Sequence, residues 1–252
     1  MAKHNCAICG AEVGLMSGQK LADGNYVCKK VCGKKVFKLF DMIPATLGDV
    51  NAHIAQVEKG TKIWQELLLP LKKSKNKDEK LVALGKGDLF VSPSTGLVAL
   101  VETNYKFMVF GKSERACVYR LADLIQYDYA EEDVKMGTDK SLKKALVVMM
   151  FKNTEGMYAF KLPVRSPLDQ QKMAKYFDKL FGIEKTLRNS FKNAKRQIDA
   201  VKAATSAVKA AAGGTLDEEQ AAQTIDAMDA SVYGDRTEWI AKADAALAPY
   251  NK

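Results

Sequence analysis

Short runs of alternating apolar and polar residues fill the middle of the chain. In "YKFMVF", Tyr105, Phe107 and Val109 share one face of a strand, because side chains alternate with a period of two. Turn-forming sequences such as "SPSTG", "TNY" and "NTEG" separate the runs. The pattern predicts seven strands, at residues 89–92, 97–102, 105–110, 116–121, 124–130, 145–151 and 157–162. Because no helical pattern interrupts them, we expect an antiparallel β barrel or sandwich.

A helix is predicted directly after the strands, in "RSPLDQQKMAKYFDKLFG". Ser166 suits the N-cap and Pro167 the first helical position. Met173, Phe177 and Leu180 form its apolar stripe. Seven strands followed by one amphipathic helix is the order found in pleckstrin-homology-like barrels, in which the helix closes one open end.

Two helices are predicted before the strands. Residues 36–43 form a short apolar stretch that stops before Pro44, and a longer helix is predicted over 49–69. The apolar positions of the longer helix recur at helical spacing: Val50, Ile54, Val57 and Ile63. Gly60 interrupts them, and the lysine-rich "PLKKSKNKDEK" that follows reads as an exposed loop.

The end of the chain is rich in alanine and predicted to be helical. Apolar residues recur there with alternating spacings of four and three, which favours either a weak coiled coil or packing against the rest of the chain: Leu187, Phe191, Ala194, Ile198, Val201, Thr205 and Val208. Gly213 and Gly214 break this helix. Capping boxes at Thr215–Glu218 and Asp235–Glu238 then predict further helices, so we expect a hairpin or small bundle.

These patterns predict an α+β protein of four segments. They are a cysteine-bearing module at residues 1–43, a helical and basic linker at 44–80, a pleckstrin-homology-like β domain with its helix at 81–182, and a helical tail at 183–252. The first 40 residues can barely bury a core of their own.

Composition fits an ordinary water-soluble chain. Apolar residues make up 47% and charged residues 27%. The opening "MAKHNCAICG" lacks the apolar region of a signal peptide, and apolar runs such as "ALVVMMF" are too short for a membrane span. We therefore expect a cytoplasmic protein, and in that reducing compartment clustered cysteines more often bind metal than form disulfides.

The net charge of +9 is unevenly distributed, at +6 over residues 1–80, +3 over 81–182, +5 over 183–212 and −5 over 213–252. A solvated basic face without a special partner is one explanation, and binding to nucleic acid, to anionic lipid or to an acidic protein is the alternative. Two clusters are the candidates for anion binding: Lys72, Lys73, Lys75 and Lys77, and then Lys185, Arg188, Lys192, Lys195 and Arg196. Few aromatic residues lie among them, which disfavours single-stranded nucleic acid.

Four cysteines carry the clearest chemistry in the sequence. Cys6 and Cys9 are separated by two residues, and Cys28 and Cys32 by three. Two such pairs supply four thiolates for tetrahedral Zn²⁺, which would also stabilise a unit with a small core. A redox pair would need a preceding strand and a helix N-terminus, which the first pair lacks. His4 is a possible substitute ligand, although an exposed side chain is the favoured interpretation.

The fifth cysteine, Cys117, lies in "ERACVYRL" and is predicted to be a buried strand residue.

The segment "CAICGAEVGLMSGQKLADGNYVCKKVC" resembles the N-terminal module of an uncharacterised bacterial family of unknown function, with its CxxCG and DG followed by cysteine. "LADLIQYDYAEED" and "ALVVMMFKNTEGMYAFKLP" resemble the β-rich region that follows in that family. The resemblance implies a zinc-binding module joined to a pleckstrin-homology-like domain, with no activity established. The three-residue gap between Cys28 and Cys32 departs from the family's usual two.

No motif predicts an enzyme. The sequence holds two histidines, neither in a nucleophile motif, and "LGKGDLF" lacks the residues of a phosphate loop. We expect a non-enzymatic adaptor or assembly protein that binds a protein partner or itself, with structural zinc and no small-molecule substrate. The alternative is binding to anionic membrane lipid or nucleic acid, and an unrecognised enzyme stays open as a third class.

Overall fold

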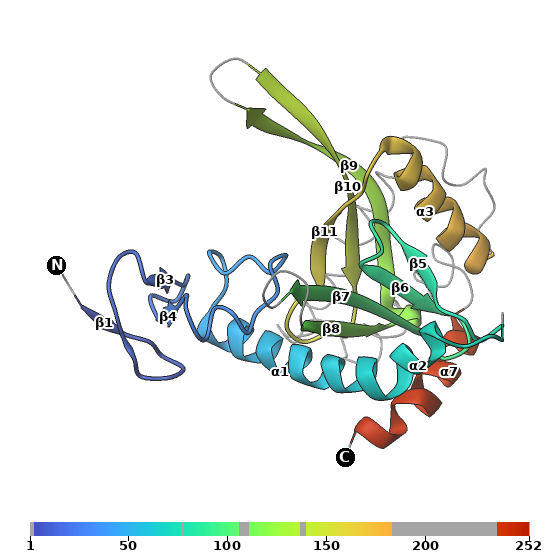
Figure 1. The fold of residues 1–252 in the computed structure, drawn as a ribbon, viewed down its shortest axis with the longest axis horizontal. Coiled ribbons are helices and arrows are strands. Elements are labelled where there is room, and N and C mark those ends of the chain that lie inside the picture. The colour runs from blue at the N-terminus through green and yellow to red at the C-terminus, as the bar shows by residue number, and fades with distance from the viewer. Residues whose placement is uncertain (1–2, 77, 106–110, 137–139, 183–235, 252) are drawn as a thin grey trace, which may run out of the picture. The chain divides into compact units, whose positions relative to one another are not determined.

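The structure is a computed structural model that describes residues 3–76, 78–105, 111–136, 140–182 and 236–251 (Figure 1). Contacts divide the chain into two compact units. The first consists of Met1–Gln170 together with Trp239–Lys252, and the second of Gln171–Glu238. Most of the described elements belong to the first unit.

Two small antiparallel strand pairs build the cysteine module, a name used here for residues 3–46. Strand β1 (His4–Asn5) pairs with β2 (Glu12–Val13), and β3 (Gly18–Lys20) pairs with β4 (Tyr26–Cys28). The loop between β3 and β4 contains the sequence Asp23-Gly24, in which Gly24 has a φ of +85°.

The short helix predicted over residues 36–43 is wrong, because this segment forms turns and irregular backbone. Its backbone groups have partners elsewhere in the fold. The amide of Phe37 donates to Nε2 of His53 at 3.1 Å, and the carbonyl of Val36 accepts from the guanidinium of Arg115 at 3.2 Å. These tertiary hydrogen bonds replace those that a helix would supply.

Helix α1 (Leu47–Ile63) continues into a π-helix (Trp64–Leu68) and then α2 (Leu69–Lys72), which together cover the predicted helix at 49–69. Thr46 and Asp49 form a capping box at its start. Its buried face is Val50, His53, Ile54, Val57, Gly60 and Ile63. Gly60 therefore lies on the packed face, where a side chain would meet the backbone of β8.

Seven strands form two open antiparallel sheets. The first contains β5 (Val82–Leu84), β6 (Leu89–Ser92), β7 (Leu97–Tyr105) and β8 (Lys112–Arg120), in that order. A 3₁₀ turn (Leu121–Asp123) leads into the second, which has the order β11 (Ala159–Pro163), β10 (Lys140–Phe151), β9 (Leu124–Met136). The described residues do not close these sheets into the predicted barrel.

The turn predicted at "TNY" is also wrong. Residues 103–105 continue strand β7 and stay in register with β8, from Glu102 opposite Arg115 to Tyr105 opposite Lys112. The long pairing partner holds the strand straight through a sequence that favours a turn. Strand β5 was not predicted.

Strands β9 and β10 continue beyond the sheet as a two-stranded hairpin. Strand β11 pairs with β10 only between Leu146 and Met150, whereas the pairing of β9 with β10 runs on to Met136 opposite Lys140. Figure 1 shows this hairpin projecting beyond the other strands.

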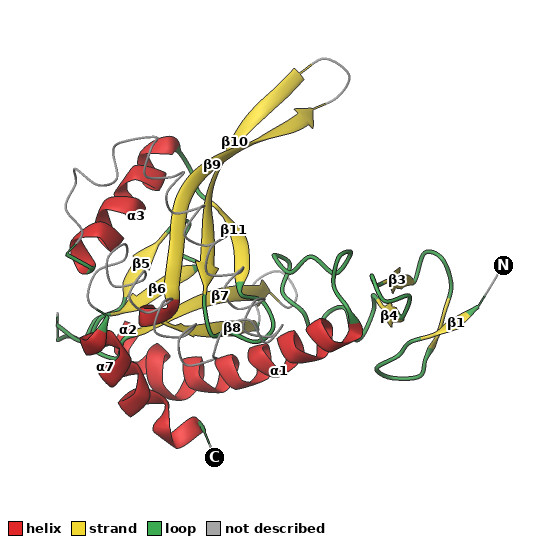
Figure 2. Cartoon of the chain, turned by 180° about the vertical axis from the view of Figure 1, so that it is seen from behind, coloured by secondary structure: helices red, strands yellow, loops and turns green. Residues whose placement is uncertain are grey.

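Two hydrophobic cores pack against α1, one near each end of the helix. The first joins the cysteine module to the start of the helix: Cys6, Val13, Leu21, Val27, Cys28, Cys32, Val36, Ala45, Val50 and Ile54. The second joins the end of the helix to the first sheet and to helix α7 (Thr237–Leu247): Ile63, Trp64, Leu68, Leu81, Phe90, Leu97, Ala99, Val101, Ala116 and Ala243. Figure 2 shows α1 passing from the strands of the module to the two sheets.

Helix α3 (Pro167–Leu180) confirms the helix predicted after the strands, and the side-chain oxygen of Ser166 accepts from the amide of Asp169 at 3.3 Å. Helix α7, followed by a 3₁₀ turn (Ala248–Tyr250), confirms a helix at "WIAKADAAL". The heptad pattern, the capping box at residues 215–218 and Asp235 lie outside the described residues.

In the described part of the chain, no helix has the length and apolar character needed to cross a membrane.

We predict that Gly60→Ala destabilises the first unit. A Cβ atom at this position would overlap the carbonyl oxygen of Ala116 and lie 2.9 Å from the amide nitrogen of Val118, so α1 and β8 would have to separate. We expect a loss of about 1–3 kcal/mol in the free energy of unfolding, measured by urea denaturation of the full chain.

Gly48→Ala is the matched control, since it lies in the first turn of the same helix and its nearest neighbour would be Oγ1 of Thr46 at 3.5 Å. We expect this change to be neutral or stabilising by up to about 1 kcal/mol. Equal effects of the two substitutions would contradict the close contact.

Candidate metal centre

The first pair of cysteines is positioned by a tight turn after β1. The amide of Gly10 donates to the carbonyl of Cys6 at 2.8 Å, and the amide of Cys6 donates to the carbonyl of Ala11 at 2.8 Å. Gly10 has a φ of +73°, a conformation that other residues rarely adopt. The glycine of "CAICG" therefore lets the chain reverse toward β2 while both sulfurs face the same side.

The backbone after β4 explains the three-residue gap between Cys28 and Cys32. Cys28 ends β4, and Cys32 lies in the series of turns that follows. Gly33 donates its amide to the carbonyl of Cys28 at 2.8 Å, which closes one helix-like turn. The same turn directs the amide of Cys32 at Sγ of Cys28, 3.3 Å away.

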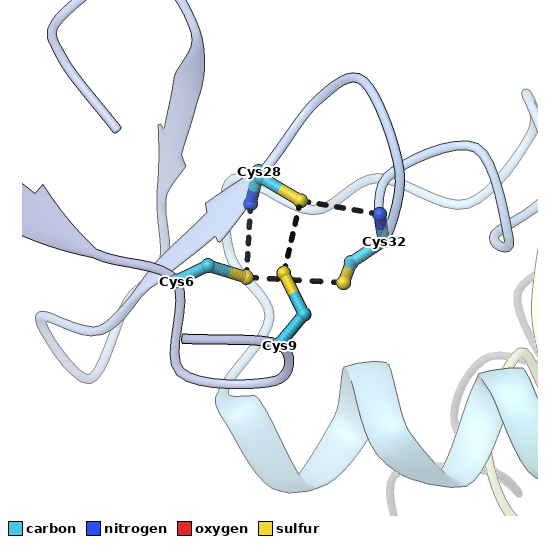
Figure 3. Close-up of side chains that lie close together, drawn as sticks. All are labelled: Cys6, Cys9, Cys28 and Cys32. Atoms are coloured by element: carbon cyan, nitrogen blue, oxygen red, sulfur yellow. Dashed lines mark hydrogen bonds between the residues drawn. The ribbon is translucent and has the colours of Figure 1, made fainter. Parts of the chain in front are cut away.

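The structure brings all four sulfurs together, within 4.8 Å of one another (Figure 3). Sγ of Cys6 lies 3.8 Å from that of Cys32, and Sγ of Cys9 lies 3.6 Å from that of Cys28. A tetrahedral ion with metal–sulfur bonds of 2.3 Å would need sulfurs about 3.8 Å apart. These cysteines therefore fit a metal ion that takes four thiolates.

Backbone amides supply hydrogen bonds to the sulfurs. Cys28 donates its amide to Sγ of Cys6 at 3.3 Å, in addition to the bond from Cys32 to Cys28. Such bonds stabilise negative sulfur and orient it toward a shared ion. Three of the cysteines are buried, and Cys9 is the exposed member through which solvent reaches the cluster.

The pKa values of the cluster move in opposite directions. Desolvation raises the pKa of Cys6, but backbone amides of Cys28, Cys9 and Ile8 outweigh it and bring the value to about 6. The amide of Cys32 likewise lowers the pKa of Cys28. Burial and the neighbouring sulfurs raise the pKa of Cys32, because a further negative charge is unfavourable beside them. A bound cation would reduce this conflict, because its positive charge offsets part of the charge of the four thiolates.

The structure also places the other residues named from the sequence. The ring of His4 stacks on Tyr26 with centroids 3.9 Å apart, and the candidate metal group contains cysteines alone. Cys117 is fully buried in β8, as predicted, and burial raises its pKa to about 12. It therefore stays a thiol and takes no part in the cluster.

Of the predicted anion-binding residues, the structure describes Lys72, Lys73 and Lys75. The ammonium of Lys72 lies over the rings of Phe90 and Trp64, at 4.3 and 5.6 Å from their centroids. Lys73 and Lys75 are exposed in the loop that follows. Lys77 and the second cluster, at residues 185–196, lie outside the described residues.

Sequence reasoning missed the residues that fasten the module to the β-rich region. Arg115 of β8 donates to the carbonyls of Lys34 and Val36, pairs with the carboxylate of Glu102, and lies over the ring of Phe37. No local pattern marks an arginine in a strand as the partner of a loop about eighty residues earlier, so only the fold reveals it.

His53 forms a second link and lies fully buried in α1. Its Nε2 accepts from the amide of Phe37, its Nδ1 lies 3.0 Å from Oε1 of Gln56, and its ring stacks on Phe40. Oε1 of Gln56 also accepts the amide of Met157 at 2.9 Å. A neutral imidazole protonated on Nδ1 satisfies both of its contacts.

Comparisons with known proteins agree with the family resemblance of the N-terminal region. Residues 4–58 match a family described as a domain of unknown function (DUF4428), so the matched part contains the cysteine module and most of α1. Neither the curated proteins nor the solved structures contain a match to this chain.

We predict that the purified full chain contains one metal ion, measured by elemental analysis and native mass spectrometry. Cys28→Ser removes a central sulfur and should abolish binding, because three protein ligands hold a structural ion far more weakly than four. Cys117→Ala is the matched control and should leave the metal content unchanged. Loss of metal in both variants, or in neither, would contradict the assignment.

We predict a pH dependence of stability that comes from His53. Burial lowers the pKa of its imidazole, with a smaller opposing effect of the Gln56 hydrogen bond. Below the unfolded value of about 6.5, the unfolded chain takes up a proton that the folded chain does not, so stability falls as the pH drops toward the folded pKa.

The expected slope is at most about 1.4 kcal/mol per pH unit. Urea denaturation at neutral and mildly acidic pH measures it. His53→Gln should reduce the slope, while His4→Gln, which changes the only other histidine in the sequence, should not. Identical slopes in the wild type and His53→Gln would show that this imidazole does not titrate between the two states.

Proposed function

We propose that the cysteine cluster binds Zn²⁺ and that the ion is structural. Four thiolates at this spacing suit tetrahedral zinc, and they leave no coordination position for water or substrate. A single iron ion accepts the same ligands, so elemental analysis of the purified protein distinguishes the two metals. The ion would hold β1, β4 and the turns after β4 together in a module with a small core.

We propose further that the β-rich region is a pleckstrin-homology-like domain. A four-stranded antiparallel sheet is followed in sequence by a three-stranded one and then by helix α3. This order supports the assignment that the sequence pattern suggested.

The function that we infer is that of a non-enzymatic adaptor or assembly protein with a protein partner. The observation that carries this proposal is the coupling of the metal module to the β-rich region. Arg115 and His53 both hold the segment after Cys32, so the ion would stabilise a surface that includes both regions. A four-thiolate centre beside this segment favours a structural role for the ion, because no coordination position is left for a reaction at the ion.

The projecting β9–β10 hairpin is the proposed partner surface. Strand β9 is an edge of its sheet. Strand β10 has no β11 neighbour in the part that precedes Leu146, which forms the hairpin. Open strand edges can accept a further strand from a partner. Tyr129, 69% exposed, lies on the edge strand β9 opposite Val147, next to the base of this hairpin, and tyrosine is enriched in protein interfaces.

Site-specific crosslinking tests the proposal. A photoreactive phenylalanine analogue in place of Tyr129 should crosslink in source-cell lysate to one defined protein or to a second copy of the chain. Tyr129→Ala should weaken capture of that partner by about tenfold or more, as expected for a central aromatic contact. Tyr158→Ala, at a residue 56% exposed in the loop before β11, is the matched control.

No crosslinked protein, combined with a strictly monomeric native mass, would contradict the adaptor function. Equal losses of partner capture in Tyr129→Ala and Tyr158→Ala would show that the partner does not bind at the hairpin.

A further inference from the structure

A small apolar surface lies at one end of the cysteine module. Leu15 is 85% exposed and Met16 is 90% exposed, in the turn between β2 and β3. Val31, 58% exposed, belongs to the turns after β4. The two segments are neighbours, because the amide of Lys29 donates to the carbonyl of Ser17 at 2.9 Å. We call Leu15, Met16 and Val31 the apolar tip.

The turn that presents Leu15 and Met16 is closed by its own hydrogen bonds. The amide of Gly14 donates to Oγ of Ser17 at 2.9 Å, and the amide of Gly18 donates to the carbonyl of Gly14 at 2.9 Å. Beneath it, Val13 belongs to the core of the module. The two side chains are thus held outward on a fixed backbone, which reduces the entropy that a binding event would cost.

Polar residues and glycine usually occupy the centre of such a turn. Here the centre is "LM", and moving either side chain from water to an apolar environment is favourable. Exposed apolar residues occur singly on most surfaces, but two adjacent ones in one turn, with a third exposed on the neighbouring segment, favour an apolar ligand.

The sequence around the tip is rich in lysine, and two of these lysines lie directly beside the tip residue Val31. From Val13 to Phe40 the sequence has six lysines, one aspartate and no arginine. Lys29 and Lys30 are exposed and directly precede Val31. The single carboxylate, Asp23, accepts from the amide of Leu47 at 2.8 Å, in the loop at the opposite end of the β3–β4 pair.

We propose that the apolar tip inserts into the headgroup region of an anionic lipid bilayer, while Lys29 and Lys30 contact the lipid phosphates. Lysine is depleted in protein–protein interfaces, and nucleic-acid or phosphopeptide recognition favours arginine, whose planar group binds phosphate with two hydrogen bonds. Binding to a bilayer requires neither bidentate hydrogen bonds to phosphate nor a complementary groove on the protein. It takes apolar side chains flanked by lysines, whose long stems reach back to the surface.

This inference goes beyond the adaptor function and does not depend on it. Membrane attachment uses the cysteine module, whereas the proposed protein partner contacts the β9–β10 hairpin. Figures 1 and 2 both show the strands of the module at the start of α1 and the hairpin above the two sheets. A chain with both surfaces would hold a protein partner at a membrane.

Vesicle co-sedimentation of the zinc-loaded full chain tests the proposal. We expect binding to vesicles of phosphatidylcholine with phosphatidylserine at low salt, and at most weak binding to pure phosphatidylcholine. Leu15→Ser combined with Met16→Ser should reduce binding by about tenfold or more, even for partial burial of both side chains. Lys29→Gln combined with Lys30→Gln should reduce it by a similar factor, since each lysine near an anionic surface contributes about 1 kcal/mol.

Two controls separate the tip from other exposed groups. Ile43→Ser changes an apolar residue that is 69% exposed in the same module. It lies near the loop at the other end of β3–β4, since the amide of Ala22 donates to the carbonyl of Ala45. Lys73→Gln combined with Lys75→Gln removes charge from the exposed loop after α2. Both controls should bind vesicles within about twofold of the wild type.

A tryptophan at the tip supplies an independent measurement. The two native tryptophans, Trp64 and Trp239, are buried, so a Met16→Trp variant adds one exposed reporter. Its emission should shift to shorter wavelength when phosphatidylserine vesicles are added, and lipid-attached quenchers should reduce it. All variants must keep the metal content and circular dichroism of the wild type, which exposed positions allow.

Three results would overturn the proposal. They are no wild-type binding to phosphatidylserine vesicles at low salt, binding that the Leu15→Ser/Met16→Ser variant retains, and an unchanged emission of Met16→Trp on vesicles. Binding to duplex DNA or to a captured protein that requires the tip, without vesicle binding, would assign the surface to that ligand instead.

Discussion

Helix α1 is the element on which the arrangement of the first unit depends. Its first turns supply Val50 and Ile54 to the core of the cysteine module, and its last turn supplies Ile63 to the core beneath the first sheet. Gly60 allows its backbone to approach β8 more closely than any side chain would permit. The small cysteine module thereby gains apolar burial that a unit of its size lacks by itself.

Electrostatics decides how the four thiols behave. The four sulfurs lie within 4.8 Å of one another. Backbone amides stabilise the thiolate form, whereas the thiolates repel one another. A bound cation would reduce this repulsion and so favour the thiolates. The same ion would order the turns after β4. On one side these turns meet Arg115 and His53, and on the other they carry Lys29, Lys30 and Val31. One metal centre would thus stabilise both the side of the module that contacts Arg115 and His53 and the side that is exposed to solvent.

Sequence patterns were informative where the cause of a structure is local. The spacing of Cys6, Cys9, Cys28 and Cys32 predicted a cluster, and the apolar runs predicted strands β6 to β11. The strand predicted at residues 105–110 lies outside the described residues except for Tyr105. Predictions went wrong where a distant partner decided the outcome. Residues 36–43 form no helix because β8 and α1 take their hydrogen-bonding groups, and "TNY" makes no turn because β8 extends alongside it. Gly60 was an interruption in the sequence pattern and is a contact in the fold.

The sequence by itself determined the ligand types, the order of strands and helices, and the excess of lysine near the N-terminus. These depend on residue identity and on spacing along a few turns of chain. The tertiary structure alone decided that the strands form two open sheets, that Arg115 and His53 join the module to them, and that Leu15, Met16 and Val31 are exposed on neighbouring segments. Those features depend on packing between residues far apart in sequence, which no local pattern encodes.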